Sequence, residues 1–232
     1  MLPGYHYSYL VGVGIFWAAW CACFVLGKNY RREIRWGTLI AAPLGLTSIL
    51  FVPQYWTPPS LFGLDQNLRV GIEDFLWAAA VGGMAAVVGE LCLRERLASL
   101  RTSRHRRHYG PFVLLCAVFV ALEVWQPHKT MNNVIVSFAF GAMILACLRR
   151  NLVPLMIVGT VTFTLLYFVL FLCVLALYPE FVKRYYNVSN LIGIYVRGVP
   201  IEELLFAGTG GAIWSVAYEY YYGYRLEAAR VI

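Results

Sequence analysis

Four acidic residues of this sequence form two matching pairs in apolar surroundings. Glu73 and Asp74 lie in the segment Gly-Ile-Glu-Asp-Phe-Leu-Trp at 71–77, and Glu202 and Glu203 lie in Val-Pro-Ile-Glu-Glu-Leu-Leu-Phe at 199–206. An acid withdrawn from water holds its proton more tightly, because desolvation disfavours the charged form. Paired carboxyl groups in a dry pocket could therefore donate and accept protons, which is the chemistry of a general acid and a general base.

A structural explanation of the pairs stands beside the catalytic one. A proline followed by acidic residues is a typical helix start, because negative charge is stabilised at the positive end of the helix dipole. Pro200, Glu202 and Glu203 fit that pattern. The occurrence of the pair at two places favours a functional role, and an acid at a helix start can serve both purposes.

Three further acids lie at the ends of apolar segments. Glu90 and Glu219 each follow the first glutamate of a motif by 17 residues, which is about 25 Å along a helix. We expect these two at the opposite membrane interface, as anchors or as partners of basic loops. Glu123 lies near the end of another apolar segment and is a further catalytic candidate.

The elements that must position these acids are long apolar segments. The 232 residues are 60% hydrophobic and 13% charged, whereas soluble domains are about 45–50% apolar and about 25% charged. A helix needs about 20 apolar residues to cross the hydrocarbon core of a bilayer, and these segments lack the alternation of strands. They cover residues 7–26, 37–52, 72–93, 111–126, 131–148, 154–177 and 201–221. The sequence therefore predicts an all-α integral membrane protein with about seven transmembrane helices.

The sequence has a net charge of +7, and its positive residues are predicted to lie mostly on one side of the membrane. When the 19 lysines and arginines are assigned to the ends of the seven segments, 14 fall on one set of alternate loops and 5 on the other. Positive residues are retained on the cytoplasmic side, so the N-terminus is predicted outside and the C-terminus inside, in the cell membrane of a prokaryote. The basic loops would contact anionic lipids, and nucleic-acid binding is not expected.

An internal repeat relates the two motifs. At an offset of 129 residues, eight of the 21 positions in 70–90 are identical to those in 199–219, and Glu73 and Glu90 fall on Glu202 and Glu219. We interpret the chain as two parallel three-helix repeats, at 1–110 and 131–232, joined by a linking helix at 111–130. An extra span between the copies gives them the same orientation, so a shared site would lie at their interface.

Aromatic residues within the motif helices are candidates for contacting a substrate. Aromatic faces stabilise cations, including carbocations, although packing also explains single aromatics. The substrate-binding candidates are Phe75, Trp77, Phe206 and Trp214. The six cysteines all fall in apolar runs and the four histidines show no ligand spacing, so neither a disulfide framework nor a metal site is predicted.

At the paired motifs the sequence resembles the membrane-integral lycopene cyclase family of bacteria, archaea and fungi. In that family a three-helix unit occurs twice, as two subunits or as one fused chain, and each unit has Pro-x-Glu-Glu/Asp at the start of its last helix. The segment 199–206 matches this pattern, and 71–77 matches it with Gly71 in place of the proline. The segment 55–63, with its aromatic, proline and glycine residues, is also similar to the approach to that motif.

The resemblance implies a cofactor-free isomerase that closes ionone rings on an acyclic carotenoid. An acid protonates the terminal double bond, the neighbouring double bond attacks the cation, and a base removes a proton. Glu73, Asp74, Glu202 and Glu203 are the expected catalytic residues, and which of them is acid or base stays open. The expected partners are a lipid-soluble polyene or isoprenoid substrate, membrane lipids, and either other carotenoid-pathway enzymes or a second copy of the chain.

Two other classes of protein remain as alternatives. A proton-coupled transporter or channel would also use intramembrane acids at a repeat interface. The clustering of the acids at one end, and the lack of glycine or proline breaks near mid-bilayer, argue against transport. The second alternative is a non-catalytic partner of an isoprenoid pathway.

Overall fold

The computed structural model describes residues 4–93 and 109–223 and is almost entirely helical in that part, which confirms the predicted all-α class. The loop with six arginines (94–107), Arg225 and Arg230 lie outside the described residues. The long helices are α1 (Ser8–Leu26), α2 (Arg31–Ala41), α5 (Ile72–Leu93), α6 (Gly110–Trp125), α7 (Thr130–Leu148), α8 (Val153–Leu177) and α10 (Ile201–Tyr222). The short elements are α3 (Ser48–Phe51), α4 (Leu64–Leu68), α9 (Phe181–Tyr185), β1 (Tyr195–Val196) and β2 (Val199–Pro200).

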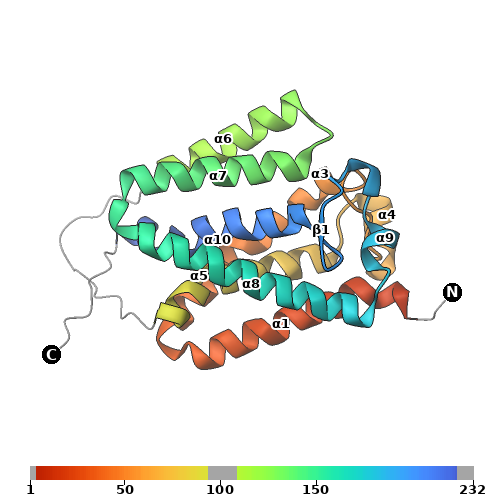
Figure 1. Ribbon diagram of the computed structural model, residues 1–232, viewed down its shortest axis with the longest axis horizontal. Coiled ribbons are helices and arrows are strands. Elements are labelled where there is room, and N and C mark those ends of the chain that lie inside the picture. Colours follow the sequence, from red (N-terminus) through yellow and green to blue (C-terminus); the bar gives the residue numbers. More distant parts are fainter. Residues whose placement is uncertain (1–3, 94–108, 224–232) are drawn as a thin grey trace.

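Five helical segments of the described residues are long and apolar enough to cross a membrane, which fits the predicted membrane protein. They are Tyr5–Leu26, Lys28–Phe51, Ile72–Leu93, Thr130–Leu148 and Arg150–Leu177, and Gly110–Trp125 is a shorter apolar helix. The seventh long helix, α10, has 22 residues, but its three glutamates and its run of tyrosines make it less hydrophobic. It lies among the other helices rather than at the periphery (Figure 1).

The second helical segment begins earlier than the sequence predicted. The apolar run suggested 37–52, whereas helical turns continue from Lys28 through α2 and α3 to Phe51. Arg31, Arg32 and Arg35 lower the hydropathy of the first turns, yet those turns also bury Glu33 and Ile34. The prediction of the start was wrong because hydropathy averages over a helix whose two faces differ.

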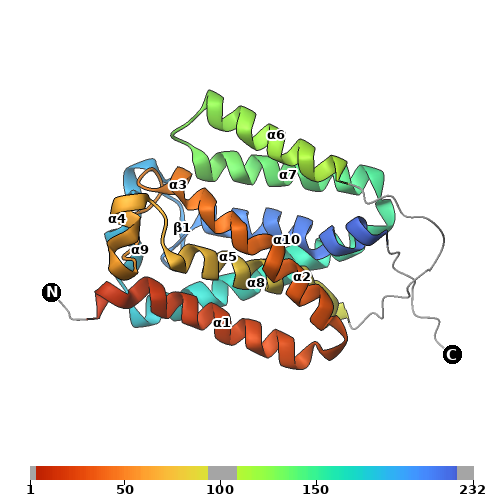
Figure 2. The same cartoon turned by 180° about the vertical axis from the view of Figure 1, so that it is seen from behind.

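The motif helices α5 and α10 lie in contact at the centre of the bundle, and the other long helices surround them. α1, α2 and α8 pack on α5, while α7 and α8 pack on α10. Figure 1 shows the α6–α7 hairpin on one side of α10 and α1 on the opposite side of the molecule. In Figure 2, which is seen from behind, α2 lies in front and packs on α5. The two motifs therefore begin on neighbouring helices in the interior.

Glycines set the closest helix contacts at equivalent positions of the two copies. A Cβ atom on Gly82 of α5 would overlap the Cβ of Ala41 on α2, and a Cβ on Gly211 of α10 would lie 2.8 Å from the carbonyl oxygen of Gly159 on α8. Gly82 and Gly211 are related by the 129-residue offset. Small residues allow helix backbones to approach closely in membranes, so each motif helix is held tightly against one neighbour.

The connections before the two motif helices fold together over one end of the bundle. The backbone N–H of Thr57 donates to the carbonyl of Tyr185, and that of Asn187 donates to the carbonyl of Tyr55. Trp56 and Tyr186 form a bridge between the two connections. This end also carries α4, α9 and β1 (Figure 1), and it closes over the first turns of α5 and α10.

Candidate functional site

Three tyrosines converge on Glu203 in the first turn of α10. The hydroxyl groups of Tyr55 and Tyr186 donate to its Oε1 at 2.9 and 2.8 Å, and the hydroxyl of Tyr167 donates to its Oε2 at 2.6 Å. All four side chains are buried. Tyr55 follows α3 and Tyr167 lies in α8, so distant parts of the chain build this one carboxylate site.

The phenols around Glu203 can act only as donors towards it. Burial, and next the Glu203 carboxylate, raise the pKa of Tyr55 and of Tyr186 well above the usual value. Both phenols therefore keep their protons at neutral pH. Hydrogen bonds to a charged group contribute roughly 1.5–3 kcal/mol each, and three of them stabilise the ionised carboxylate at a place where burial opposes it.

Asp74, the equivalent acid of the first copy, has a different set of partners. The hydroxyl of Tyr9 donates to its Oδ1 at 2.7 Å, and the backbone N–H of Gly71 donates to its Oδ2 at 2.8 Å. Pro200 stands at the position equivalent to Gly71 in the second copy and has no N–H to donate. The glycine that departs from the motif thus supplies a hydrogen bond that a proline could not.

Glu73 and Glu202 tie the two motif helices to the connections that precede them. Oε1 of Glu73 accepts the backbone N–H of Leu61 at 2.7 Å, and Oε1 of Glu202 accepts the backbone N–H of Ile192. Both side chains are buried. The first glutamate of each pair holds a loop, whereas the second acid of each pair is held by tyrosine.

A fifth carboxyl group, Asp65 of α4, belongs to the same end of the bundle and was not predicted. It is 1% exposed, and neither of its oxygens receives a hydrogen bond from a described residue. A Cβ on Gly71 would lie 2.9 Å from Oε2 of Glu73 and 3.2 Å from Oδ1 of Asp65, so both acids approach the same glycine. Burial, and next the charge of Asp74, raise the pKa of Asp65 to about 7.

Two of the four predicted aromatic residues meet between the copies. The rings of Trp77 and Phe206 stack with centroids 5.9 Å apart, and Trp77 also packs edge-on against Tyr167 at 6.4 Å. Phe75 is half-buried on α5, where its backbone lies against Gly45. Trp214 lies further along α10 and contacts Trp36. Trp77 and Phe206 are therefore the predicted aromatics that the structure brings nearest to the Glu203 cluster.

Glu123, the further catalytic candidate, connects two helices. Its Oε1 accepts the hydroxyl of Thr130 at 2.6 Å and its Oε2 accepts the side-chain amide of Asn133 at 2.8 Å. The same hydroxyl contacts the carbonyl of Leu50 at the end of α3. These contacts hold α6 to the start of α7 and to α3. None of these contacts involves one of the four motif acids.

The arginines that precede the motifs do not neutralise the motif acids in the described structure. Arg69 and Arg197 are both exposed and both have a positive φ. Among the residues that the structure describes, the ion pair found is the one between Arg184 and Glu180 on the exposed face of α9. Hydrogen-bond donors therefore stabilise the motif carboxyl groups, and these arginines do not.

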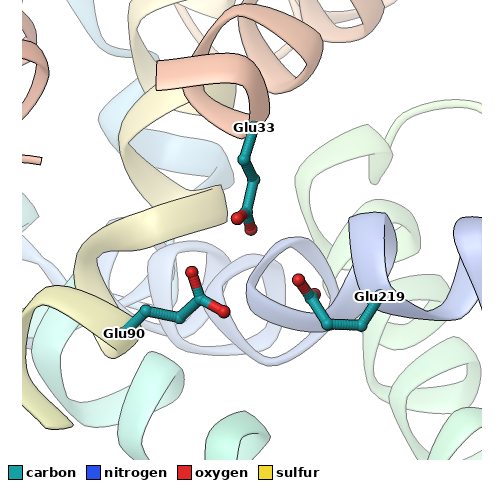
Figure 3. A group of neighbouring side chains, drawn as sticks. All are labelled: Glu33, Glu90 and Glu219. Atoms are coloured by element: carbon teal, nitrogen blue, oxygen red, sulfur yellow. The ribbon is translucent and has the colours of Figure 1, made fainter. Parts of the chain in front are cut away.

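Glu90 and Glu219 form a separate cluster at the other end of the bundle. Both are buried, and Glu33 of α2 joins them, with ligand atoms of all three within 4.8 Å of one another. Figure 3 shows the three carboxyl groups pointing towards one another from α2, α5 and α10. Carboxylates at this spacing could hold a divalent cation or share protons. The sequence prediction of interface anchors missed Glu33, because its segment was not assigned to a helix.

The fold and the site define an all-α membrane protein with two buried carboxylate centres on neighbouring central helices. Residues 128–221 match the family model described as lycopene cyclase, which confirms the resemblance over α7, α8, α10 and the connection that holds Tyr186. No curated protein and no solved structure matches the chain. The match supports carotenoid cyclisation as the activity and a lipid-soluble carotenoid as the substrate.

Proposed function

We propose that this protein closes rings on the end groups of an acyclic carotenoid by acid–base catalysis within the membrane. The observation that carries the proposal is the Glu203 centre, a buried carboxylate with three phenol donors inside the family-matched segment. Ring closure is an isomerisation, so it requires proton transfer but no net oxidation or reduction. Carboxyl groups in a dry site can supply both the acid and the base.

The reaction needs a protected cation between its two proton transfers. Protonation of the terminal double bond leaves a positive charge on carbon, the neighbouring double bond closes the ring, and loss of a proton restores neutrality. Tyr167, Trp77 and Phe206 pack together beside Glu203, and aromatic faces attract cations. These aromatics and the Glu203 carboxylate would stabilise the cation, while the surrounding apolar side chains exclude water.

Residues of both copies would contribute to one reaction. Glu203 would act on protons, Asp74 would contribute a second buried carboxyl group, and Glu73 and Glu202 would fix the connections that cover the site. Tyr55 of the first copy donates to Glu203 of the second, which favours a site between the copies. The division of the chain at 1–110, 111–130 and 131–232 stays a prediction.

The experiment that tests the function is expression in a host that accumulates lycopene. We expect the wild-type chain to convert lycopene into monocyclic or bicyclic products that pigment chromatography separates. Glu203→Gln keeps size and polarity but removes the acid–base group, so cyclic products should fall by about 10²–10⁴-fold. If the wild type leaves acyclic carotenoids unchanged at normal membrane levels, the proposal is wrong, and proton flux in liposomes becomes the next measurement.

A further inference from the structure

Asp74 and Glu203, the second acids of the two motifs, both have surroundings that suit a negative charge. Each oxygen of Asp74 accepts one donor, and Glu203 accepts three phenols. Donors aimed at a carboxylate favour its ionised form. A carboxyl group whose oxygens are met by donors is suited to accept a proton and to stabilise a cation, rather than to supply the first proton of a cyclisation.

Asp65 has the opposite surroundings. It receives no hydrogen bond from a described residue at either oxygen, and three groups that face it are acidic: Asp74 and Glu73 on α5 and the phenol of Tyr9 on α1. Like charges in one buried site cannot all ionise, so one member of the group keeps a proton. Asp74 accepts a donor at each oxygen and Glu73 accepts the N–H of Leu61, whereas Asp65 accepts no donor from a described residue. Asp65 is therefore the member of the group with the fewest donors to stabilise a negative charge, which suits it to carry the proton.

The backbone around Gly71 is built for this acidic group. Ser60 accepts the backbone N–H of Asp65 at 2.8 Å and fixes the start of α4. Gly71 leaves room for carboxyl oxygens of Asp65 and Glu73 that a Cβ would meet at 3.2 and 2.9 Å. The second copy has Pro200 at the equivalent position and tyrosines around its acid. Carboxyl groups therefore surround the motif of the first copy, and tyrosine hydroxyl groups surround the motif of the second copy.

We propose that the two copies divide the chemistry, with Asp65 as the proton donor and Glu203 as the proton acceptor. This assignment rests on the cyclase activity proposed above and adds a residue outside both motifs. Tyr55, Tyr167 and Tyr186 are positioning residues, since they act through the Glu203 carboxylate. A negative charge on Asp74 would favour the protonated form of Asp65.

Each proton and bond is accounted for in this sequence. The O–H bond of Asp65 breaks and a C–H bond forms at the terminal double bond, which leaves a cation on the adjacent carbon. The π electrons of the neighbouring double bond form the new ring bond. A C–H bond next to the resulting cation then breaks, its electrons form the ring double bond, and Glu203 takes the proton. Return of that proton to Asp65 restores the enzyme, and the substrate has been isomerised without gain or loss of atoms.

The test compares Asp65→Asn and Glu203→Gln in purified protein supplied with lycopene in D2O. Asp65→Asn should block the first step, so neither cyclic product nor deuterium in recovered lycopene is expected. Glu203→Gln should still allow protonation and its reversal, so recovered lycopene should gain deuterium at the terminal alkene carbon while ring formation falls. Wild-type product should carry solvent deuterium in the ring. Mass spectrometry measures the deuterium content of the recovered lycopene and of the cyclic product for both variants and the wild type.

Folding and pH provide the controls. Glu180→Gln, at the exposed residue that precedes α9, should match the wild type. The thermal midpoint in detergent shows whether Asp65→Asn folds. Asp65→Glu keeps an acid, so it should retain activity with a displaced pH profile. Since the Asp65 carboxyl has a pKa of about 7, it is protonated below that value, and the wild-type rate should fall as pH rises through 7.

Two results would overturn the assignment while leaving the cyclase proposal intact. One is a folded Asp65→Asn that cyclises lycopene within about threefold of the wild-type rate. The other is equal deuterium exchange into recovered lycopene by Asp65→Asn and Glu203→Gln. An inactive wild type would instead overturn the cyclase proposal itself, so the two failures are distinguishable.

Discussion

Trp77 and Phe206 occupy equivalent positions in the two copies of the motif, and their rings stack on each other 5.9 Å apart. The two motif helices therefore meet through matching residues. Around this contact the two copies differ, because acids surround Gly71 on one side and tyrosines surround Glu203 on the other. The predictions below separate the roles of these groups.

The two glutamates of the second motif should differ sharply in their effect on activity. Glu202→Gln retains a carbonyl oxygen that can accept the N–H of Ile192, so we expect less than about a tenfold loss of cyclisation. Glu203→Gln should lose about 10²–10⁴-fold. Rates on lycopene in detergent or liposomes measure both variants at matched protein amounts. Equal large losses would show that Glu202 also takes part in proton transfer.

Tyr167→Phe should lower activity while preserving the aromatic packing. The variant removes the 2.6 Å hydrogen bond to Glu203 but keeps the ring that contacts Phe16 and Trp77. We expect a fall of about tenfold or more in rate, since a hydrogen bond to a charged group contributes roughly 1.5–3 kcal/mol. If the role of Tyr167 is purely structural, the variant should have a lower thermal midpoint and an unchanged pH–rate profile. If Tyr167 positions Glu203, the part of the pH–rate profile that depends on protonation of Glu203 should shift.

Gly71→Pro should impair the protein even though it restores the residue of the other motif. Proline removes the N–H that donates to Asp74 at 2.8 Å, and its Cβ would press on carboxyl oxygens of Glu73 and Asp65. Gly71→Ala keeps the N–H and adds only the Cβ, so it separates the two effects. We expect both variants to lose activity and the proline to lose more. Wild-type activity in Gly71→Pro would contradict the assigned role of this N–H.

Gly82→Ala should destabilise the bundle more than a matched change on α1. Its new methyl group would overlap Ala41 and force α2 away from α5, and overpacking of this kind costs typically about 1–3 kcal/mol. Gly14→Ala is the control, because Gly14 is exposed and a Cβ there meets nothing within 4 Å. Thermal unfolding in detergent measures both, and equal midpoints would contradict the close packing.

Glu33→Gln should maintain or increase stability and leave cyclisation unchanged. It removes one of three carboxyl groups whose ligand atoms lie within 4.8 Å, which reduces like-charge repulsion in a buried cluster. We expect a gain on the order of 1 kcal/mol or less. A loss of several kcal/mol that excess chelator reproduces in the wild type would show instead that the three charges bind a cation.

The sequence alone determined the membrane class, the apolar helices and the positions of the acids within them. Hydropathy and residue type carry that information locally, and the 129-residue offset predicts that the acidic pairs are copies of each other. The match to lycopene cyclases over 128–221 agrees with the motif at 199–206. The predicted start of the second apolar segment at residue 37 was wrong. Three arginines lower the hydropathy of the preceding helical turns, although these turns bury Glu33.

Only the tertiary structure decided which groups surround each acid. Tyr55 reaches Glu203 across 148 residues and Tyr9 reaches Asp74 across 65, and no local pattern specifies such pairs. Asp65 lies in a five-residue helix of the connection before α5, and the sequence analysis did not single it out. The folding of that connection over the helix ends buries it beside two other acids. Proton affinity depends on burial and on neighbouring charge, and both are properties of the packed chain rather than of the residue.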